Sequence, residues 1–191
     1  MQAALGSVDK SDICRLKQLV FGEKTETIVD DLTPLNKSAK QQRKIASTIV
    51  GGNLTLVSRM IETPLIDIRG KILLLEEVDE PFRKVDGIIQ QFKLAGYFQN
   101  DNAPIAVLLG KFSASEPIEE TQVNNCLERF AKELDEDNVP VLQCLNIGHG
   151  EKNHPIPLGT NAILQLGEKS FLTVQSGGVQ PKLDVSLFLT I

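Results

Sequence analysis

Apolar positions in the middle of the chain follow two alternating patterns. Nearly continuous apolar runs lie at 71–77, 104–112 and 139–145, whereas residues 80–96 and 119–134 repeat apolar positions at helical spacing. Continuous apolar strands that alternate with amphipathic helices are typical of a parallel sheet with βαβ crossovers. The centre of the chain is therefore predicted to have an α/β fold.

Four further elements are predicted before this block. A short peripheral helix is expected from Ser11 to Gly22, and strands are expected at 25–31 and 44–50. Gly51, Gly52 and Asn53 follow the second strand, and Asn is a good N-cap for a helix over 54–62. A strand that turns into a capped helix accounts for these glycines without a phosphate-binding loop.

After His149 the pattern changes to short segments separated by glycine-containing turns. These segments lie at 161–166, 169–175 and 183–190 and predict an antiparallel meander. The whole chain is thus expected to form one domain, 1–191, with a parallel central sheet, covering helices and an antiparallel meander.

Composition and charge exclude several classes of function. The 191 residues are 41% hydrophobic and carry a net charge of −5, which suits a globular domain and gives no basic surface for nucleic acid or anionic membrane. The apolar runs are far shorter than the roughly 20 residues of a membrane span. The first twenty residues lack the unbroken apolar segment of a signal peptide, so a cytoplasmic location is expected.

The three cysteines indicate neither a disulfide framework nor a zinc site. Cys14, Cys126 and Cys144 are odd in number, widely spaced and without a CxxC pair. They are expected to be reduced and mostly buried. The chain also offers too few converging ligands for a metal site, and we expect no metal and no cofactor.

Candidate chemistry lies just beyond the predicted parallel strands, where open α/β sheets form their ligand crevice. Glu76, Glu77 and Glu80 follow the first strand, and Lys111 follows the second. His149 follows the third between two glycines that leave its imidazole uncovered. A general base needs a carboxylate to fix its tautomer, which favours Glu76 with His149. A solvated or structural role for either side chain stays open at this point.

Several motifs in order resemble the carboxyl-terminal domain of the LD-carboxypeptidase family, which includes proteins of microcin C immunity. The resemblance covers roughly residues 45–166. It rests on GGNLTLVSRMIETP, GKILLLEEVDEPFRKVDGIIQQFKLAG, IAVLLGKFS and VPVLQCLNIGHGEKNHPIPLGTNAIL. The family pattern G-K-I-L-x-L-E ends on Glu76, and the GH segment places its histidine at His149.

The resemblance implies a cytoplasmic serine peptidase that cleaves an L,D-peptide bond, releasing the D-alanine of murein tetrapeptide. It implies a Ser-His-Glu triad with Glu76 and His149 in this domain, a swivelling β/β/α arrangement, and a homodimer. The family's nucleophile lies in an amino-terminal domain, and no serine of this chain has the context of a nucleophile elbow. We therefore expect the isolated chain to be an inactive half of the enzyme.

Two readings of the whole chain stay open. The chain supplies two triad residues to an amino-terminal domain that acts on a murein peptide or a peptide antibiotic, or it is a non-catalytic interaction or scaffold module that pairs with such a fragment or with itself. Arg83 matches the family's P-(F/Y)-R segment and is a candidate for substrate binding or loop ordering. It is equally open to a surface role in which it pairs with Glu77, Asp79 or Glu80.

Overall fold

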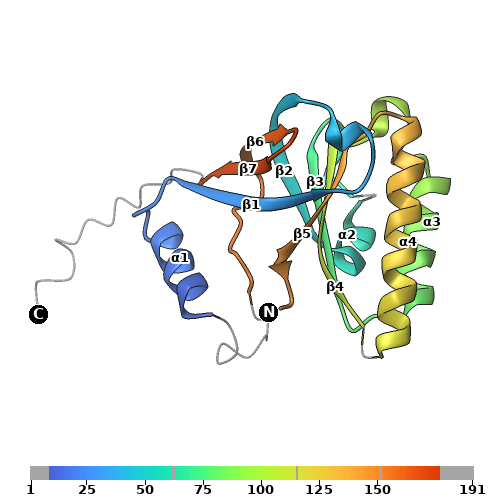
Figure 1. The fold of residues 1–191 in the computed structure, drawn as a ribbon, viewed down its shortest axis with the longest axis horizontal. Helices are drawn as coiled ribbons and strands as arrows, with labels where there is room; N and C mark the ends of the chain where they lie inside the picture. The colour runs from blue at the N-terminus through green and yellow to red at the C-terminus, as the bar shows by residue number, and fades with distance from the viewer. Residues whose placement is uncertain (1–8, 62, 115, 151, 177–191) are drawn as a thin grey trace, which may run out of the picture.

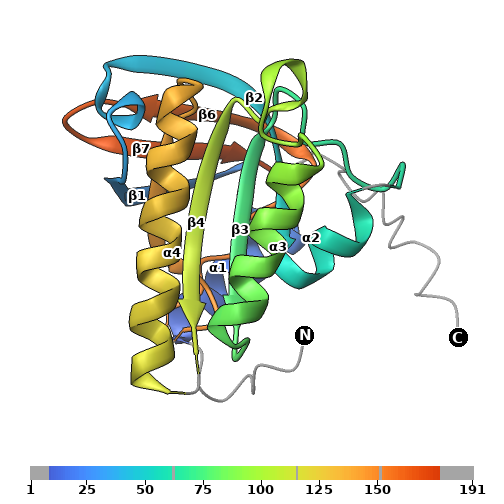
Figure 2. The same ribbon diagram turned by 90° about the vertical axis from the view of Figure 1, so that its right-hand side faces the viewer.

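The computed structural model describes residues 9–61, 63–114, 116–150 and 152–176. Its helices and strands are shown in Figures 1 and 2. In chain order they are α1 (Lys10–Val20), β1 (Glu26–Pro34), η1 (Ser38–Lys40), β2 (Arg43–Asn53), α2 (Leu54–Met60), β3 (Ile72–Val78), α3 (Phe82–Leu94), η2 (Asn100–Asn102), β4 (Ala106–Ser113), α4 (Pro117–Glu136), β5 (Val141–Gly148), β6 (Thr160–Leu166) and β7 (Ser170–Gln175).

The strands form one mixed sheet that closes into a barrel in the order β1-β5-β4-β3-β2-β6-β7. Strands β2, β3, β4 and β5 are parallel neighbours, whereas β6 is antiparallel to β2 and β7 to β6. The predicted parallel centre and antiparallel meander are confirmed. Closure was not predicted: β1 pairs antiparallel with both β7 and β5. The segment 183–190 lies outside the described residues.

Two apolar clusters divide the interior. One lies between the sheet and the helices α2, α3 and α4, and the other fills the barrel. The helices α3 and α4 lie side by side over one face of the strands (Figures 1 and 2). Leu73 and Leu75 of β3 belong to the helix-covered cluster, and Ile72 and Leu74 to the barrel cluster. Since side chains alternate along a strand, Glu76 points to the barrel and Glu77 to the helices.

Most predicted boundaries hold within a few residues, with one instructive difference. Strand β2 continues through Gly51 and Gly52 to Asn53, which pairs with Glu76 of β3. A Cβ on Gly51 would lie 1.9 Å from the Leu74 carbonyl oxygen, so only glycine fits this register. The Asn53 side chain accepts a hydrogen bond from the Leu56 N–H, as expected for the cap of α2.

The cysteines are buried at two of three positions. Burial raises the pKa of Cys126 to about 12 and that of Cys144 to about 11, which keeps both thiols protonated. Cys14 is exposed on α1, so the expectation of mostly buried cysteines holds for the other two.

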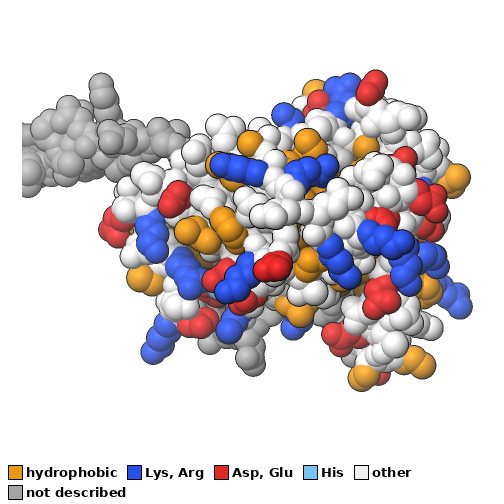
Figure 3. Space-filling model, turned by 45° about the horizontal axis from the view of Figure 1, so that its top comes forward, with side chains coloured by type: hydrophobic (Ala, Val, Ile, Leu, Met, Phe, Trp, Pro, Cys, Tyr) orange, Lys and Arg blue, Asp and Glu red, His pale blue; other side chains and the backbone are white. Residues whose placement is uncertain are grey.

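The outer surface mixes charges of both signs. Lys and Arg side chains are interspersed with Asp and Glu on the face in Figure 3.

Among the described helices, none has the length and apolar character that crossing a membrane requires.

Candidate active site

Glu76 and His149 meet at the carboxyl-terminal mouth of the barrel. The His149 Nδ1 lies 2.7 Å from the Glu76 Oε2, although the two residues are 73 positions apart. The Glu76 side chain is 11% exposed and that of His149 is 36% exposed. The predicted hydrogen-bond contact between them is confirmed, and its carboxylate is buried while its imidazole reaches solvent.

Two glycines make this contact possible. The two residues come from strands that are not neighbours, because β4 lies between β3 and β5. A Cβ on Gly110 of β4 would lie 3.0 Å from the Glu76 Cβ and 2.8 Å from the Ile147 carbonyl oxygen. A Cβ on Gly148 would lie 3.2 Å from the Glu76 Cβ. The missing side chains leave the space through which Glu76 crosses β4 to reach His149.

The next residue of β3, Glu77, has a different set of partners. Its carboxylate accepts hydrogen bonds from the Thr55 N–H at 2.9 Å, the Thr55 hydroxyl at 2.7 Å and the Asn53 amide. The Val78 N–H donates to it at 3.1 Å. Glu77 thus joins β3 to the start of α2, a role that sequence reasoning missed.

Burial is the largest influence on Glu76. It raises the pKa of this carboxyl above its ordinary value, and the hydrogen bond and charge of His149 oppose that rise. An ionised carboxylate only accepts hydrogen bonds, so when Glu76 is ionised the His149 Nδ1 carries the proton. The Nε2 then keeps its lone pair and can accept a proton from an incoming group.

The other predicted site residues are not part of this pair. Glu80 contacts Lys84 one helical turn further on. Arg83 is exposed at the start of α3, and within the described ranges it forms no salt bridge with Glu77, Asp79 or Glu80. Lys111 is half-buried, and its side chain runs beside Gly150 in the loop that holds His149.

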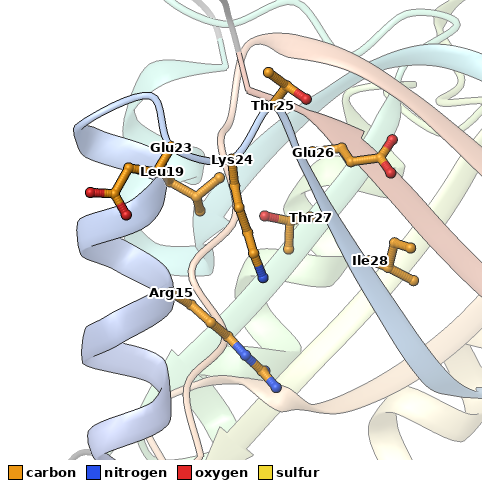
Figure 4. Close-up of a pocket in the computed structure, with 8 residues that line it drawn as sticks. All are labelled: Arg15, Leu19, Glu23, Lys24, Thr25, Glu26, Thr27 and Ile28. Atoms are coloured by element: carbon orange, nitrogen blue, oxygen red, sulfur yellow. The ribbon is translucent and has the colours of Figure 1, made fainter.

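Two surface hollows lie away from the pair. One, of about 450 Å³, lies between α1 and β1, and Figure 4 shows Arg15 and Lys24 extending into it. Glu23 and Glu26 also line it, which balances the charge. The other, of about 500 Å³, is lined by Tyr97 and residues of 61–69 and 102. Over the described part of the chain no three His, Cys, Asp or Glu residues converge as a metal site would require.

Comparisons with protein families and curated sequences agree with one another. The model of the LD-carboxypeptidase C-terminal domain matches residues 46–164. A putative carboxypeptidase of Rickettsia conorii is 33% identical over 156 residues, which are 81% of this chain and 46% of that protein. The probable murein peptide carboxypeptidase of Bacillus subtilis is 28% identical over 155 residues, 81% of this chain and 47% of that protein. The chain spans about half the length of the curated relatives it matches.

Solved structures share the fold. The muramoyltetrapeptide carboxypeptidase of Oxalobacter formigenes superposes with a TM-score of 0.70 at 23% identity, over 89% of this chain and 56% of that chain. The microcin C7 self-immunity protein MccF in its wild-type apo state gives a TM-score of 0.55 at 20% identity, over 76% of this chain and 41% of that chain. At these identities the likeness concerns the fold.

Proposed function

Because the chain belongs to the LD-carboxypeptidase family through its C-terminal domain, we propose that Glu76 and His149 are two members of a Ser-His-Glu triad that hydrolyses an L,D-peptide bond. The observation that supports this most is the 2.7 Å contact between a buried carboxylate and an imidazole that reaches solvent. In a triad, the carboxylate fixes the tautomer of the imidazole and stabilises its charged form.

In the proposed mechanism His149 is the general base. Glu76 accepts the Nδ1–H of His149, and the Nε2 takes the proton from a serine hydroxyl as the serine attacks the scissile carbonyl. The imidazolium then returns this proton to the leaving amine, which is the terminal D-amino acid. Water enters in a second step, and the same base deprotonates it to release the enzyme from its acyl intermediate.

The nucleophile is proposed to lie in an amino-terminal domain outside this chain. The chain spans about half of its curated relatives, and none of its serines has the context of a nucleophile elbow. The oxyanion donors belong to that domain as well, so the chain alone is expected to be inactive. A swivelling β/β/α arrangement, a homodimer and a cytoplasmic location complete the proposal on family grounds.

Murein tetrapeptide is the proposed substrate, with D-alanine as the product. Two relatives are named for murein peptides, the Bacillus subtilis protein and the murein tetrapeptide carboxypeptidase of Pseudomonas aeruginosa. Arg83 stays a candidate for binding the substrate carboxylate, because it is exposed in the first turn of α3 and a guanidinium binds two oxygens at once.

A fusion protein tests the proposal. The amino-terminal half of the Bacillus subtilis relative is joined to this chain, and D-alanine release from murein tetrapeptide is measured. We expect the fusion to release D-alanine, the chain alone to release none, and His149→Ala in the fusion to lower turnover by about 10⁴- to 10⁶-fold. A fusion whose turnover survives His149→Ala contradicts the triad.

The same experiment decides against the scaffold alternative. A non-catalytic module would bind the amino-terminal half in size-exclusion chromatography without raising D-alanine release. An Arg83→Lys fusion adds a finer test, because lysine keeps the charge and loses the planar fork. A raised KM in a folded Arg83→Lys fusion supports substrate binding by Arg83. Unchanged kinetics would indicate that Arg83 is only a surface residue.

A further inference from the structure

The helix α1 is attached to the rest of the chain by a polar contact. Of its eleven residues, all of them described, Asp12 is the only buried one, at 2% exposure. Leu16 and Val20 are exposed, and the hollow of Figure 4 separates the helix from β1. Among the apolar residues of α1, only Ile13 and Leu19 are even half-buried, so apolar packing contributes little to fixing the helix in its place.

The buried Asp12 carboxylate binds the loop that follows β5. Its Oδ2 accepts a hydrogen bond from the Asn153 N–H at 2.9 Å. Its Oδ1 lies 3.4 Å from an Arg15 guanidinium nitrogen and 3.6 Å from the His154 Nε2. Burial of a carboxylate is costly, and an apolar side chain of similar size is often as stable in such a place. Stability alone is a poor explanation for an aspartate here.

Asn153 connects Asp12 to Gly148, the residue directly before His149. Its Oδ1 accepts a hydrogen bond from the Gly148 N–H at 3.2 Å. The His154 N–H donates to the Asn146 carbonyl at 2.7 Å, which closes the loop from the other side. Gly148 has a φ of 116° and precedes His149 directly, so the direction of the imidazole depends on the orientation of this one peptide.

We propose that Asp12 and Asn153 are positioning residues that hold His149 against Glu76 through the Gly148 peptide. That this positioning matters for turnover rests on the proposed function. The positioning of His149 itself does not depend on that function. In this arrangement α1 is a brace: through Asn153 it helps to keep the imidazole in one tautomer and one orientation, just beyond Gly148, where β5 still pairs with Lys111 of β4.

Nitrogen-15 NMR of the His149 ring in the chain alone tests the proposal. In the wild type the Nδ1–H tautomer should dominate, because the Glu76 carboxyl group lies 2.7 Å from Nδ1. Asp12→Ala and Asn153→Ala should each lower the fraction of this tautomer about twofold or more, because the imidazole regains freedom to turn. Asp12→Asn should keep most of it, since its amide oxygen can still accept the Asn153 N–H.

Asp135→Ala is the matched control. This aspartate also joins a helix to a loop, accepting hydrogen bonds from the Ser38 N–H and hydroxyl at 2.7 Å, but it lies at the end of α4, away from the His149 mouth. Its replacement should leave the His149 tautomer unchanged. Exchange of the Gly148 amide should quicken about tenfold in Asn153→Ala and stay unchanged in Asp135→Ala.

An unchanged His149 tautomer in a folded Asn153→Ala chain overturns the proposal, even if Asp12→Ala does not fold. An equal change in Asp135→Ala overturns it as well, because the effect would then be general loosening. The outcome is separate from the fusion experiment: the NMR signals need no serine and no substrate. In the fusion, a lower turnover with Asn153→Ala than with wild type, together with a near-wild-type turnover with Asp12→Asn, would link the brace to catalysis.

Discussion

Two consecutive carboxylates of β3 are both buried and face opposite sides of the sheet. Glu76 is 8% exposed at the mouth of the barrel, and Glu77 is 3% exposed on the helix-covered side. Glu77 accepts hydrogen bonds from the fixed donors of Asn53, Thr55 and Val78. Glu76 instead pairs with His149, whose imidazole reaches solvent.

The difference lies in the kind of partner. Backbone, hydroxyl and amide donors fix the position of the Glu77 carboxylate, so this side chain connects β3 to α2. An imidazole can gain and lose a proton, so the Glu76 pair can move charge during a reaction. Burial alone therefore does not distinguish the two carboxylates, whereas the titratable partner at a solvent-facing edge supports the proposed role of Glu76.

The largest effect on stability is expected at Glu77. Glu77→Ala leaves the Thr55 N–H and hydroxyl without their acceptor, and we expect it to lower the free energy of unfolding by about 3 kcal/mol. Urea denaturation followed by circular dichroism measures it. Glu80→Ala, which removes only the contact of a partly exposed pair, should change stability by less than about 0.5 kcal/mol. Equal losses would remove the distinction between a buried tie and a surface pair.

Next in size is the effect of filling the space that Glu76 crosses. The added methyl of Gly110→Ala would overlap the Ile147 carbonyl and the Glu76 side chain, which should cost about 2 kcal/mol and weaken the contact with His149. Gly87→Ala is the control, because nothing lies within 4 Å of a Cβ there and α3 should gain about 0.5 kcal/mol. A Gly110→Ala chain as stable as wild type would show that the glycine is not needed.

Apart from the controls at Glu80 and Gly87, the smallest effect on stability is expected at Glu76. Glu76→Gln should change the free energy of unfolding at pH 7 by less than about 1 kcal/mol, because the amide fills the same space and can still contact His149. Burial raises the Glu76 pKa in the folded state. Wild type thus loses stability as the pH rises from 4.5 through the folded pKa, and the variant should gain relative to it over that range. A Glu76→Gln variant that loses stability relative to wild type over this pH range would contradict a raised Glu76 pKa.

Some of this arrangement could be predicted from sequence and some could not. The apolar runs of β3, β4 and β5 and the helices between them follow from local pattern, and the resemblance directed attention to Glu76 and His149. The pairing of β1 with β7 joins Thr27 to Val174, and no local pattern specifies contacts over such a separation. The roles of Gly110 and Asp12 could not be predicted for a related reason. Each depends on what lies opposite it in space.

The turnover of two glutamine variants tests the central claim most directly. In the fusion with the amino-terminal half of the Bacillus subtilis relative, Glu76→Gln should lower the kcat of D-alanine release by about 10⁴-fold, since an amide stabilises the wrong tautomer of His149. Glu77→Gln, corrected for the folded fraction, should keep kcat within about tenfold, because its partners only build the fold. Near-wild-type turnover in the Glu76→Gln fusion would contradict the account.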